Sequence, residues 1–353
     1  MNLSNPEQPT GTPNREYFRF SGKGGEYFRI WIVNLTLTVL TLGIYSAWAK
    51  VRRNRYIYGS TSVTGGHFDY HATPVQILRG RLLAMVLFLV FLMAPAVLPG
   101  AEAVLAVLLF LLTPWLIVRS KMFNLRYTSC RNIRFSFQPA YAEAVKVFLG
   151  LILLLPFTLG LIIPYAHYRR NAFMVNGTSY GTLKLQLADI NGRVYLNYLY
   201  GLLLLFFLGL GVAVVSGGML ALSGAAETEA EIPDLASALP VILMIVLYYV
   251  IFQFVNALVL RDTVNSTTIG EHQLGCDWSP GKMLLIYLTN VVAIALSLGL
   301  LIPWAQMRIS RYQLNHTYVD VRGTIDDVIA AQASDVSSIG EEIGDIFDID
   351  VGL

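Results

Sequence analysis

Residues 41–53 read TLGIYSAWAKVRR, and two similar stretches follow, TLGLIIPYAHYRR at 158–170 and SLGLLIPWAQMRI at 297–309. Each has Thr or Ser before Leu-Gly, then apolar residues, an aromatic–Ala pair and a polar or basic end. Similar stretches so far apart in the chain indicate an internal repeat. Aromatic and basic residues at the end of an apolar run are typical of a membrane–water interface. The pattern therefore predicts a membrane protein with repeated segments.

The composition agrees with this prediction. The chain of 353 residues is 55% hydrophobic and 14% charged, whereas soluble domains are about 45–50% apolar and about 25% charged. A polar stretch precedes the first apolar run, so we expect no cleaved secretory signal. Seven runs approach the roughly 20 residues that cross a bilayer as a helix. They cover residues 27–49, 82–98, 104–118, 145–166, 195–219, 239–260 and 283–305.

The basic residues discriminate between two topologies. If all seven runs cross the bilayer, Lys and Arg divide between the two faces with only a weak bias. If 27–49, 145–166 and 283–305 instead enter and return to the same face, all 25 Lys and Arg lie on that face. Basic residues mark the cytoplasmic side, and Gly43, Gly160 and Gly299 interrupt these runs where a turn would sit. We therefore favour re-entrant segments, with spanning segments as the alternative.

Polar connectors between the runs contain aromatic or β-branched residues, a turn-forming pair and a Thr. Such segments are typical of β-hairpins, and Thr73-Pro74 or Ser279-Pro280 then predicts the start of the next helix. Open strand edges are not tolerated in hydrocarbon, so we expect the hairpins to form a cytoplasmic layer. The connectors are NRYIYGST (54–61), NAFMVNGT (171–178), NALVLRDT (256–263) and SRYQLNHT (310–317).

We predict an α-helical polytopic membrane protein with two spanning helical hairpins, three re-entrant or spanning helical segments, and short cytoplasmic β-hairpins. Residues 17–323 form its single membrane-embedded domain. Residues 1–16 are expected to be flexible, and residues 324–353 form a tail with eight acidic residues and no Lys or Arg. Both termini are expected in the cytoplasm. The repeat segments are 17–70, 131–181 and 274–322.

Two amides inside apolar runs and a set of interfacial residues are the candidate functional positions. Asn34 and Asn290 lie nine residues before the repeated Gly of the first and third copies. An unbonded amide in hydrocarbon is costly, so these residues either line a solute path or pin the repeat-related helices to each other. Basic residues near Trp or Tyr at helix ends are expected to contact anionic lipid headgroups. These interfacial residues are Trp48, Lys50, Arg52, Arg53, Arg169, Arg170, Trp304 and Arg308.

One segment has the residue types of a metal site. His67, Asp69 and His71 alternate along GGHFDYH, which would place them on one face of a strand with ligands suited to Zn²⁺ or Fe²⁺. Alternatively, His71 simply flanks the helix start at Thr73. We otherwise expect no cofactor and no nucleic-acid partner.

Small residues at Gly209, Ala213 and Gly217 allow another helix to approach closely. Packing within the chain and a homo-oligomer both explain this spacing.

The whole pattern resembles a known family. The motifs that carry the resemblance are FRFSGKGGEYFRIWIVN from residue 18, FDYHATPVQILRGRLLA at 68–84 and GEEIGDIFDIDVGL at 340–353. They are similar to the YjgN-like family of bacterial inner-membrane proteins, over nearly the whole chain after the first dozen residues. The resemblance implies a multi-pass helical body in the bacterial cytoplasmic membrane. It brings no catalytic residues, because the family has no established activity.

Three functions fit these observations. The first is transport or lipid handling through repeat-related re-entrant helices, and the second is a non-catalytic scaffold that binds a cytoplasmic partner through the β-hairpins. The third is a metal-dependent membrane enzyme, although we do not expect catalysis. No Asp, Glu, Lys or Arg lies deep in the two spanning hairpins, so the signature of a proton relay or ion pump is missing.

Overall fold

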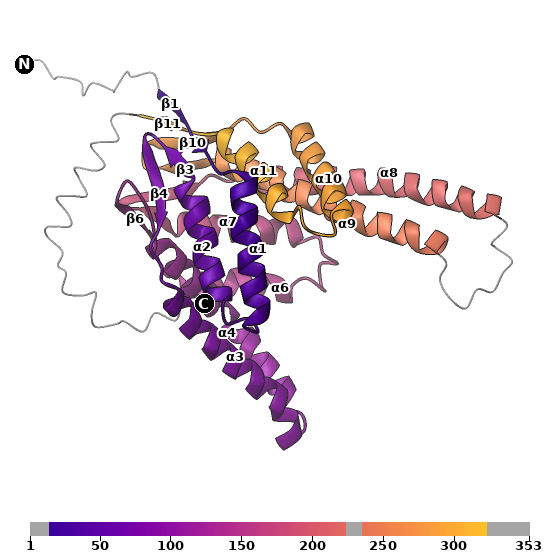
Figure 1. The fold of residues 1–353 in the computed structure, drawn as a ribbon, viewed down its shortest axis with the longest axis horizontal. Helices are drawn as coiled ribbons and strands as arrows, with labels where there is room; N and C mark the ends of the chain where they lie inside the picture. Colours follow the sequence, from indigo (N-terminus) through magenta and orange to yellow (C-terminus); the bar gives the residue numbers. More distant parts are fainter. Residues whose placement is uncertain (1–13, 224–234, 323–353) are drawn as a thin grey trace, which may run out of the picture.

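Helical hairpins alternate with β-hairpins along the chain (Figure 1). The computed structural model describes residues 14–223 and 235–322. Helix α1 (Gly24–Leu40) pairs with α2 (Ser46–Gly59), and α3 (Pro74–Val97) pairs with α4 (Ala101–Arg126). In the next hairpin, α5 (Tyr141–Val145), η1 (Lys146–Gly150) and α6 (Leu151–Leu153) form the first arm and α7 (Ile163–Asn176) forms the second. Helix α8 (Asn191–Ser223) pairs with α9 (Leu235–Asn265), and α10 (Pro280–Leu296) pairs with α11 (Ile302–Asn315).

The strands are short and belong to one antiparallel sheet, in the order β1-β11-β10-β9-β8-β7-β6-β5-β4-β3-β2. Apart from the end strands β1 and β2, every strand has two strand neighbours, so the sheet joins each β-hairpin to the next. The strands are β1 (Asn14–Tyr17), β2 (Arg19–Phe20), β3 (Thr61–Val63), β4 (Gly66–Tyr70), β5 (Thr128–Cys130), β6 (Ile133–Phe137), β7 (Thr178–Tyr180), β8 (Leu183–Leu187), β9 (Thr267–Ile269), β10 (His272–Cys276) and β11 (Thr317–Val321).

The two ends of this sheet meet in a single segment of chain. Strands β1 and β2 occupy opposite ends of the order, yet only Phe18 separates them in the sequence. The Phe18 N–H donates to Thr317 O of β11, and the Ser21 N–H donates to Ser60 O beside β3, each at 2.9 Å. Residues three apart in an extended strand direct their N–H groups to opposite sides. Residues 14–21 thus join β11 to β3 and close the sheet, which we call the strand ring.

Alternating residues give the strand ring an apolar inside and a polar outside. In β4, half-buried Phe68 lies between exposed His67 and Asp69, as expected for a strand with one covered face. The Phe68 ring stacks against the rings of Phe18 and Phe135, each at a centroid distance of 6.2 Å. Outside the ring, the carboxylate of Asp320 accepts from Arg15 Nε at 3.0 Å and joins β11 to β1.

The predicted connectors are only partly strands, and this prediction was wrong in its boundaries. Residues 54–59 belong to α2, and the corresponding residues of the other connectors belong to α7, α9 and α11. The connector at 256–263 lies wholly within α9, and the strand that follows it begins at Thr267. Each of β3, β5, β7, β9 and β11 begins at a Thr whose hydroxyl donates to a helix carbonyl four residues earlier. The last carbonyls of a helix have no hydrogen-bond partner within the helix. Because the Thr hydroxyl supplies one, the chain leaves the helix without an unpaired buried carbonyl. The five bonds, from Thr61, Thr128, Thr178, Thr267 and Thr317, measure 2.6–2.9 Å.

The helix-start prediction at Thr73-Pro74 is confirmed, because Thr73 and Gln76 form a capping box with Pro74 in the first turn. Ser279-Pro280 is also confirmed as a helix start, with Ser279 at the N-cap of α10 and Pro280 in its first turn.

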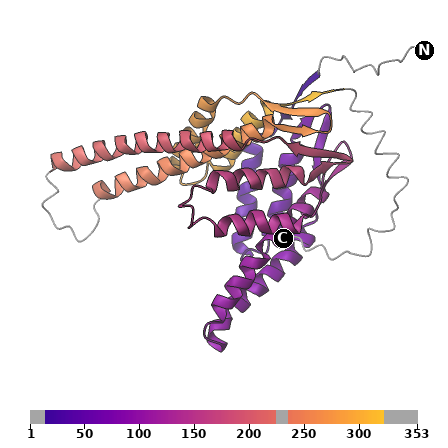
Figure 2. The same ribbon diagram turned by 180° about the vertical axis from the view of Figure 1, so that it is seen from behind.

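In the part of the chain that the structure describes, four helices are long and apolar enough to span a bilayer. They form the two predicted spanning hairpins, α3 with α4 and α8 with α9, and the chain is therefore polytopic. Both hairpins extend away from the strand ring, in different directions (Figures 1 and 2). Their outer surfaces are apolar and uncovered, as in the half-exposed side chains of Phe88, Leu111 and Phe207. Such a surface requires lipid rather than water around it.

The three remaining runs are interrupted by turns. Residues 41–45, 154–162 and 297–301 connect the two arms of α1/α2, α6/α7 and α10/α11. In each turn a Leu-Gly pair adopts a left-handed backbone, with φ near +50° at the Leu and between +84° and +93° at the Gly. A left-handed Leu is costly, and the Gly that follows it carries no such penalty. The strands that flank each run, such as β2 and β3, pair with each other, so each run returns to the strand ring.

Of the three small residues predicted to allow close helix packing, only one packs against α9. Gly209 is buried, and a Cβ there would lie 3.3 Å from Met244 Cε of α9, whereas nothing lies within 4 Å of Gly217. Ala213 and Gly217 are exposed. Packing within the chain explains Gly209, and a homo-oligomer through Ala213 and Gly217 stays a prediction. Among the glycines of α8 in the described residues, Gly201 has the tightest contact with α9, and the sequence argument missed it.

Replacing Gly201 by Val is expected to destabilise the α8–α9 hairpin by about 2 kcal/mol through overpacking. A Cβ at this position would lie 2.3 Å from Val255 Cγ2, so one helix must move. The matched control is Gly211→Val in the same helix, where a Cβ meets nothing within 4 Å. Thermal unfolding in detergent should separate the two variants, and equal midpoints would contradict this packing.

Candidate functional site

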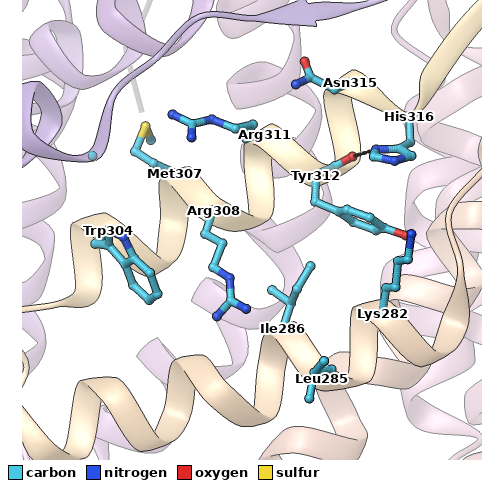
Figure 3. Close-up of a pocket in the computed structure, with 11 residues that line it drawn as sticks. Lys282, Leu285, Ile286, Trp304, Met307, Arg308, Arg311, Tyr312, Asn315 and His316 are labelled. Carbon is cyan, nitrogen blue, oxygen red and sulfur yellow. Dashed lines mark hydrogen bonds between the residues drawn. The ribbon is translucent and has the colours of Figure 1, made fainter.

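A wide cleft lies between α10 and α11 (Figure 3). It has a volume of about 570 Å³ and opens beside Gly24 of α1. Its cations are Lys282 of α10 with Arg308 and Arg311 of α11, and none of the residues that line it is Asp or Glu. Exposed Leu285 and Trp304 add apolar surface. The cleft is therefore amphipathic and positively charged.

Arg308 is held in position by polar atoms of the facing helix. Its Nη1 donates to Thr289 Oγ1 at 2.7 Å and to Asn290 Oδ1 at 3.1 Å. The guanidinium carbon lies 5.3 Å from the centroid of the Trp304 ring, within the range of a cation–π interaction. Figure 3 shows Arg308 extending towards α10 while Arg311 points away from it. No carboxylate contacts Arg308 among the residues described, so its charge is available to an anion.

Arg311 connects this cleft to the strand ring. Its Nη2 donates to Gly22 O at 2.7 Å, immediately after β2. The neighbouring α1 packs closely on α11, because a Cβ at Gly24 would lie 3.1 Å from Trp304 Cδ1, and the Tyr27 hydroxyl donates to Gln306 Oε1 at 3.0 Å. The first and third short hairpins therefore lie side by side.

A second cationic cleft of about 290 Å³ lies between α1, α2 and α3. Lys50, Arg53 and Arg81 line it, again without Asp or Glu. Arg81 donates to Ser46 Oγ at the first turn of α2, which fixes the short hairpin against a spanning helix. Burial lowers the pKa of Lys50, and the nearby charges of Arg81 and Arg53 lower it further. A bound anion would offset this mutual repulsion.

The two predicted amides occupy matching places in their hairpins, and Asn34 also lines the α1–α2–α3 cleft. Asn34 and Asn290 are 8% and 3% exposed. Each Nδ2 lies 3.5 Å from a carbonyl of the other arm of its own hairpin, Ala49 O and Ala305 O respectively. The amides therefore bridge the arms within a hairpin rather than one hairpin to the other. Asn290 Oδ1 is paired with Arg308, whereas Asn34 Oδ1 has no hydrogen-bond partner.

The predicted interfacial residues lie in several different places in the structure. Trp304 and Arg308 share the α10–α11 cleft, and Lys50 and Arg53 share the α1–α2–α3 cleft. Trp48 packs on a core cluster and Arg52 Nη1 donates to the Tyr45 hydroxyl at 3.2 Å. Arg169 forms a 3.1 Å ion pair with Glu143. Arg170 lies one residue further along α7 and lines neither cleft.

Sequence reasoning missed two of the cations, Lys282 and Arg311. Lys282 lies in the first turn of α10, and Arg311 lies one turn beyond Arg308. The available signal was helical spacing, because residues three and four apart share a face. That signal places Arg311 beside Arg308, but it cannot bring Arg81 to Lys50.

The candidate metal ligands do not converge. His67 and Asp69 are exposed on the outer face of β4, and His71 Nε2 lies 2.7 Å from Ser129 Oγ. Within the described ranges, no group of three His, Cys, Asp or Glu residues is placed to hold a metal ion.

The four apolar helices of spanning length in the described ranges define a multi-pass membrane protein. The chain belongs to a bacterial family described as "Bacterial protein of unknown function (DUF898)", whose model matches residues 15–346. The resemblance to YjgN proteins is thereby confirmed.

The chain is similar to proteins called "Inner membrane protein YjgN". The protein from Salmonella typhimurium strain LT2 is 36% identical over 126 residues, which is 35% of this chain and 32% of the relative. The protein from Escherichia coli K12 is 35% identical over 121 residues, which is 34% of this chain and 30% of the relative. The matched parts thus span about a third of each relative. No solved structure matches the chain.

Proposed function

We propose that this protein binds phospholipid headgroups within one leaflet of the bacterial inner membrane, as a lipid-handling protein. The observation that carries the proposal is the cleft between α10 and α11, where three cations meet apolar Trp304 and Leu285 without a carboxylate. A phospholipid presents the matching pair of surfaces, an anionic phosphate and apolar chains. Arginine pairs with phosphate through strong charge-assisted hydrogen bonds.

The three short hairpins enter this leaflet and return without crossing the bilayer. The left-handed leucines at their turns support this, because Leu42, Leu159 and Leu298 are 95%, 92% and 93% exposed. Three nearly bare leucines at the tips of apolar hairpins are unfavourable in water. Irregular backbone at membrane depth needs neighbouring helices around it, which α3 supplies for the first hairpin through Arg81.

The spacing of the first basic residue after each turn sets the depth of insertion. Lys50 follows Gly43 by seven residues, and Arg308 follows Gly299 by nine. At a rise of about 1.5 Å per residue, each tip lies about 10–14 Å beyond these cations. This is close to half of the roughly 30 Å hydrocarbon core. The clefts that contain the cations are then at the level of the headgroups.

The strand ring and both termini lie in the cytoplasm under this proposal. All five helical hairpins return to the ring, so the basic residues collect on the ring side. Basic residues near membrane helices favour the cytoplasmic side.

The matching Leu-Gly turns and the matching Asn34 and Asn290 bridges support descent of the first and third hairpins from one repeated unit.

The other two functions have less support. Among the described strands, only the end strands β1 and β2 have a single strand neighbour, so little edge is left for a scaffold to bind its partner by strand addition. The histidines of the proposed metal-dependent enzyme lie apart from both clefts.

Replacing Arg308 by Gln is expected to weaken the binding of phosphatidylglycerol about tenfold, because a charge-assisted phosphate contact contributes about 1.5–3 kcal/mol. Native mass spectrometry of the protein with defined lipids measures this loss. Arg134→Gln, an exposed arginine on the outer face of β6, is the matched control and should bind as the parent does. Equal binding by both variants, or equal affinity for phosphatidylcholine in the parent, would overturn the proposal.

A further inference from the structure

The strand ring encloses a second cavity, separate from the cationic clefts. Its volume is about 260 Å³. Residues of β3 to β11 line it, together with Phe18 between β1 and β2. Barrels of this size commonly enclose a ligand, and the mouth of a barrel is a frequent ligand site. The lining residues are Phe18, Val63, Thr64, Phe68, Cys130, Arg131, Phe135, Tyr180, Leu183, Leu185, Ile269, His272, Leu274, Val319 and Val321.

The lining is divided into an aromatic arc and an aliphatic arc. Phe18, Phe68 and Phe135 follow one another with interplanar angles of 20° and 13°, and Tyr180 continues the arc at 4.9 Å from Phe135. Leu185, Leu274 and Val319 occupy the central positions of β8, β10 and β11. A flat ring between these arcs contacts aromatic faces on one side and branched aliphatic groups on the other.

The polar groups at the cavity already have partners within the protein. The Tyr180 hydroxyl donates to Cys130 O at 3.0 Å, and the Thr64 hydroxyl donates to Val63 O at 2.7 Å. Arg131 Nη2 donates to Thr64 O at 2.5 Å, and His272 Nδ1 accepts from the Arg322 N–H at 3.1 Å. Burial lowers the pKa of His272, so this imidazole is neutral at neutral pH. The cavity therefore requires no charged or strongly polar ligand.

We propose that the strand ring binds a small uncharged aromatic molecule, of about the size of a bicyclic ring system, in this cavity. An apolar cavity of about 150 Å³ is sufficient for benzene, so 260 Å³ accommodates a second fused ring. Offset and edge-on contacts with the phenylalanines stabilise such a ligand beyond the burial of its area. The site lies on the ring side of the molecule and does not depend on lipid binding.

Indole is the probe for the first test, with the full-length protein in nanodiscs and saturation-transfer NMR as the readout. We expect saturable binding to the parent. Leu185→Trp fills the cavity and should weaken binding at least tenfold. The matched control is Gln186→Trp, which adds the same side chain to the exposed outer face of β8 and should bind as the parent does. Equal signals from both variants, or a signal that never saturates, would mean that indole only partitions into lipid.

A second measurement uses the parent alone, in case Leu185→Trp does not fold. Photolysis of a small uncharged aryl diazirine should label peptides that contain Phe135 or Tyr180, and indole should suppress this labelling. Labelling confined to the four spanning helices would overturn the proposal. Binding that appears only after removal of residues 324–353 would also overturn it, since the chain itself would then be the occupant.

Discussion

Replacing Phe68 by Asp is expected to cost at least about 3 kcal/mol of stability and to open the strand ring. Removing a large core aromatic side chain costs about 3–5 kcal/mol, and a carboxylate without a partner in an apolar interior adds to this cost. Phe68 is the central ring of the stack from Phe18 to Phe135. Chemical unfolding of the purified protein in detergent, followed by circular dichroism, measures the loss.

The matched control for this prediction is His67→Asp. It introduces the same side chain one residue earlier in the same strand, but on the exposed outer face. Surface substitutions of this kind usually change stability by no more than about 0.5 kcal/mol. If the two variants unfolded at the same denaturant concentration, β4 would not have one face inside a closed ring.

Single cysteines introduced at His67, Thr182 and Glu271 are expected to react with a membrane-impermeant maleimide from the same side of the membrane. These exposed residues belong to three different β-hairpins, and one continuous sheet cannot lie on both faces of a bilayer. Glu102, in the first turn of α4, should be labelled from the opposite side. The expected contrast is complete labelling against none, in inside-out vesicles compared with spheroplasts.

The two native cysteines should not interfere with this labelling. Cys130 and Cys276 are free and buried. Burial raises the pKa of Cys276 to about 11 and also raises the pKa of Cys130. At pH 7.5 the reactive thiolate is therefore scarce at both positions. Reaction at Thr182 from one side and at Glu271 from the other would contradict the single sheet and restore a topology in which the short runs cross.

The sequence predicted the elements whose signals are local. The two spanning hairpins follow from length and hydropathy, because about 20 apolar residues are a sufficient signal for a spanning helix. The turns at Gly43, Gly160 and Gly299 follow from the repeated Leu-Gly pair. The β-hairpins were placed too early, since aromatic residues such as Tyr56 and Tyr58 have strand propensity but here continue α2. The bond from Thr61 to Ile57 O ends that helix, and propensity alone does not reveal it.

In the candidate site, too, the sequence predicted some residues, and only the tertiary structure added others. Lys50, Arg53, Trp304 and Arg308 were found because basic and aromatic residues cluster at the ends of apolar runs. Arg81 joins Lys50 only because α3 packs against α2, through the contact of Arg81 with Ser46.

The sequence by itself thus determined that this is a membrane protein, where its spanning helices lie and which residues have interfacial chemistry. Each of these depends only on residues within one continuous stretch of the chain. Tertiary structure alone decided that the strands close into a ring and that cations from different helices share a cleft. Closure joins Arg15 to Asp320, which are 305 residues apart. Such a contact depends on the stability of all the intervening pairs together, and no local pattern records it.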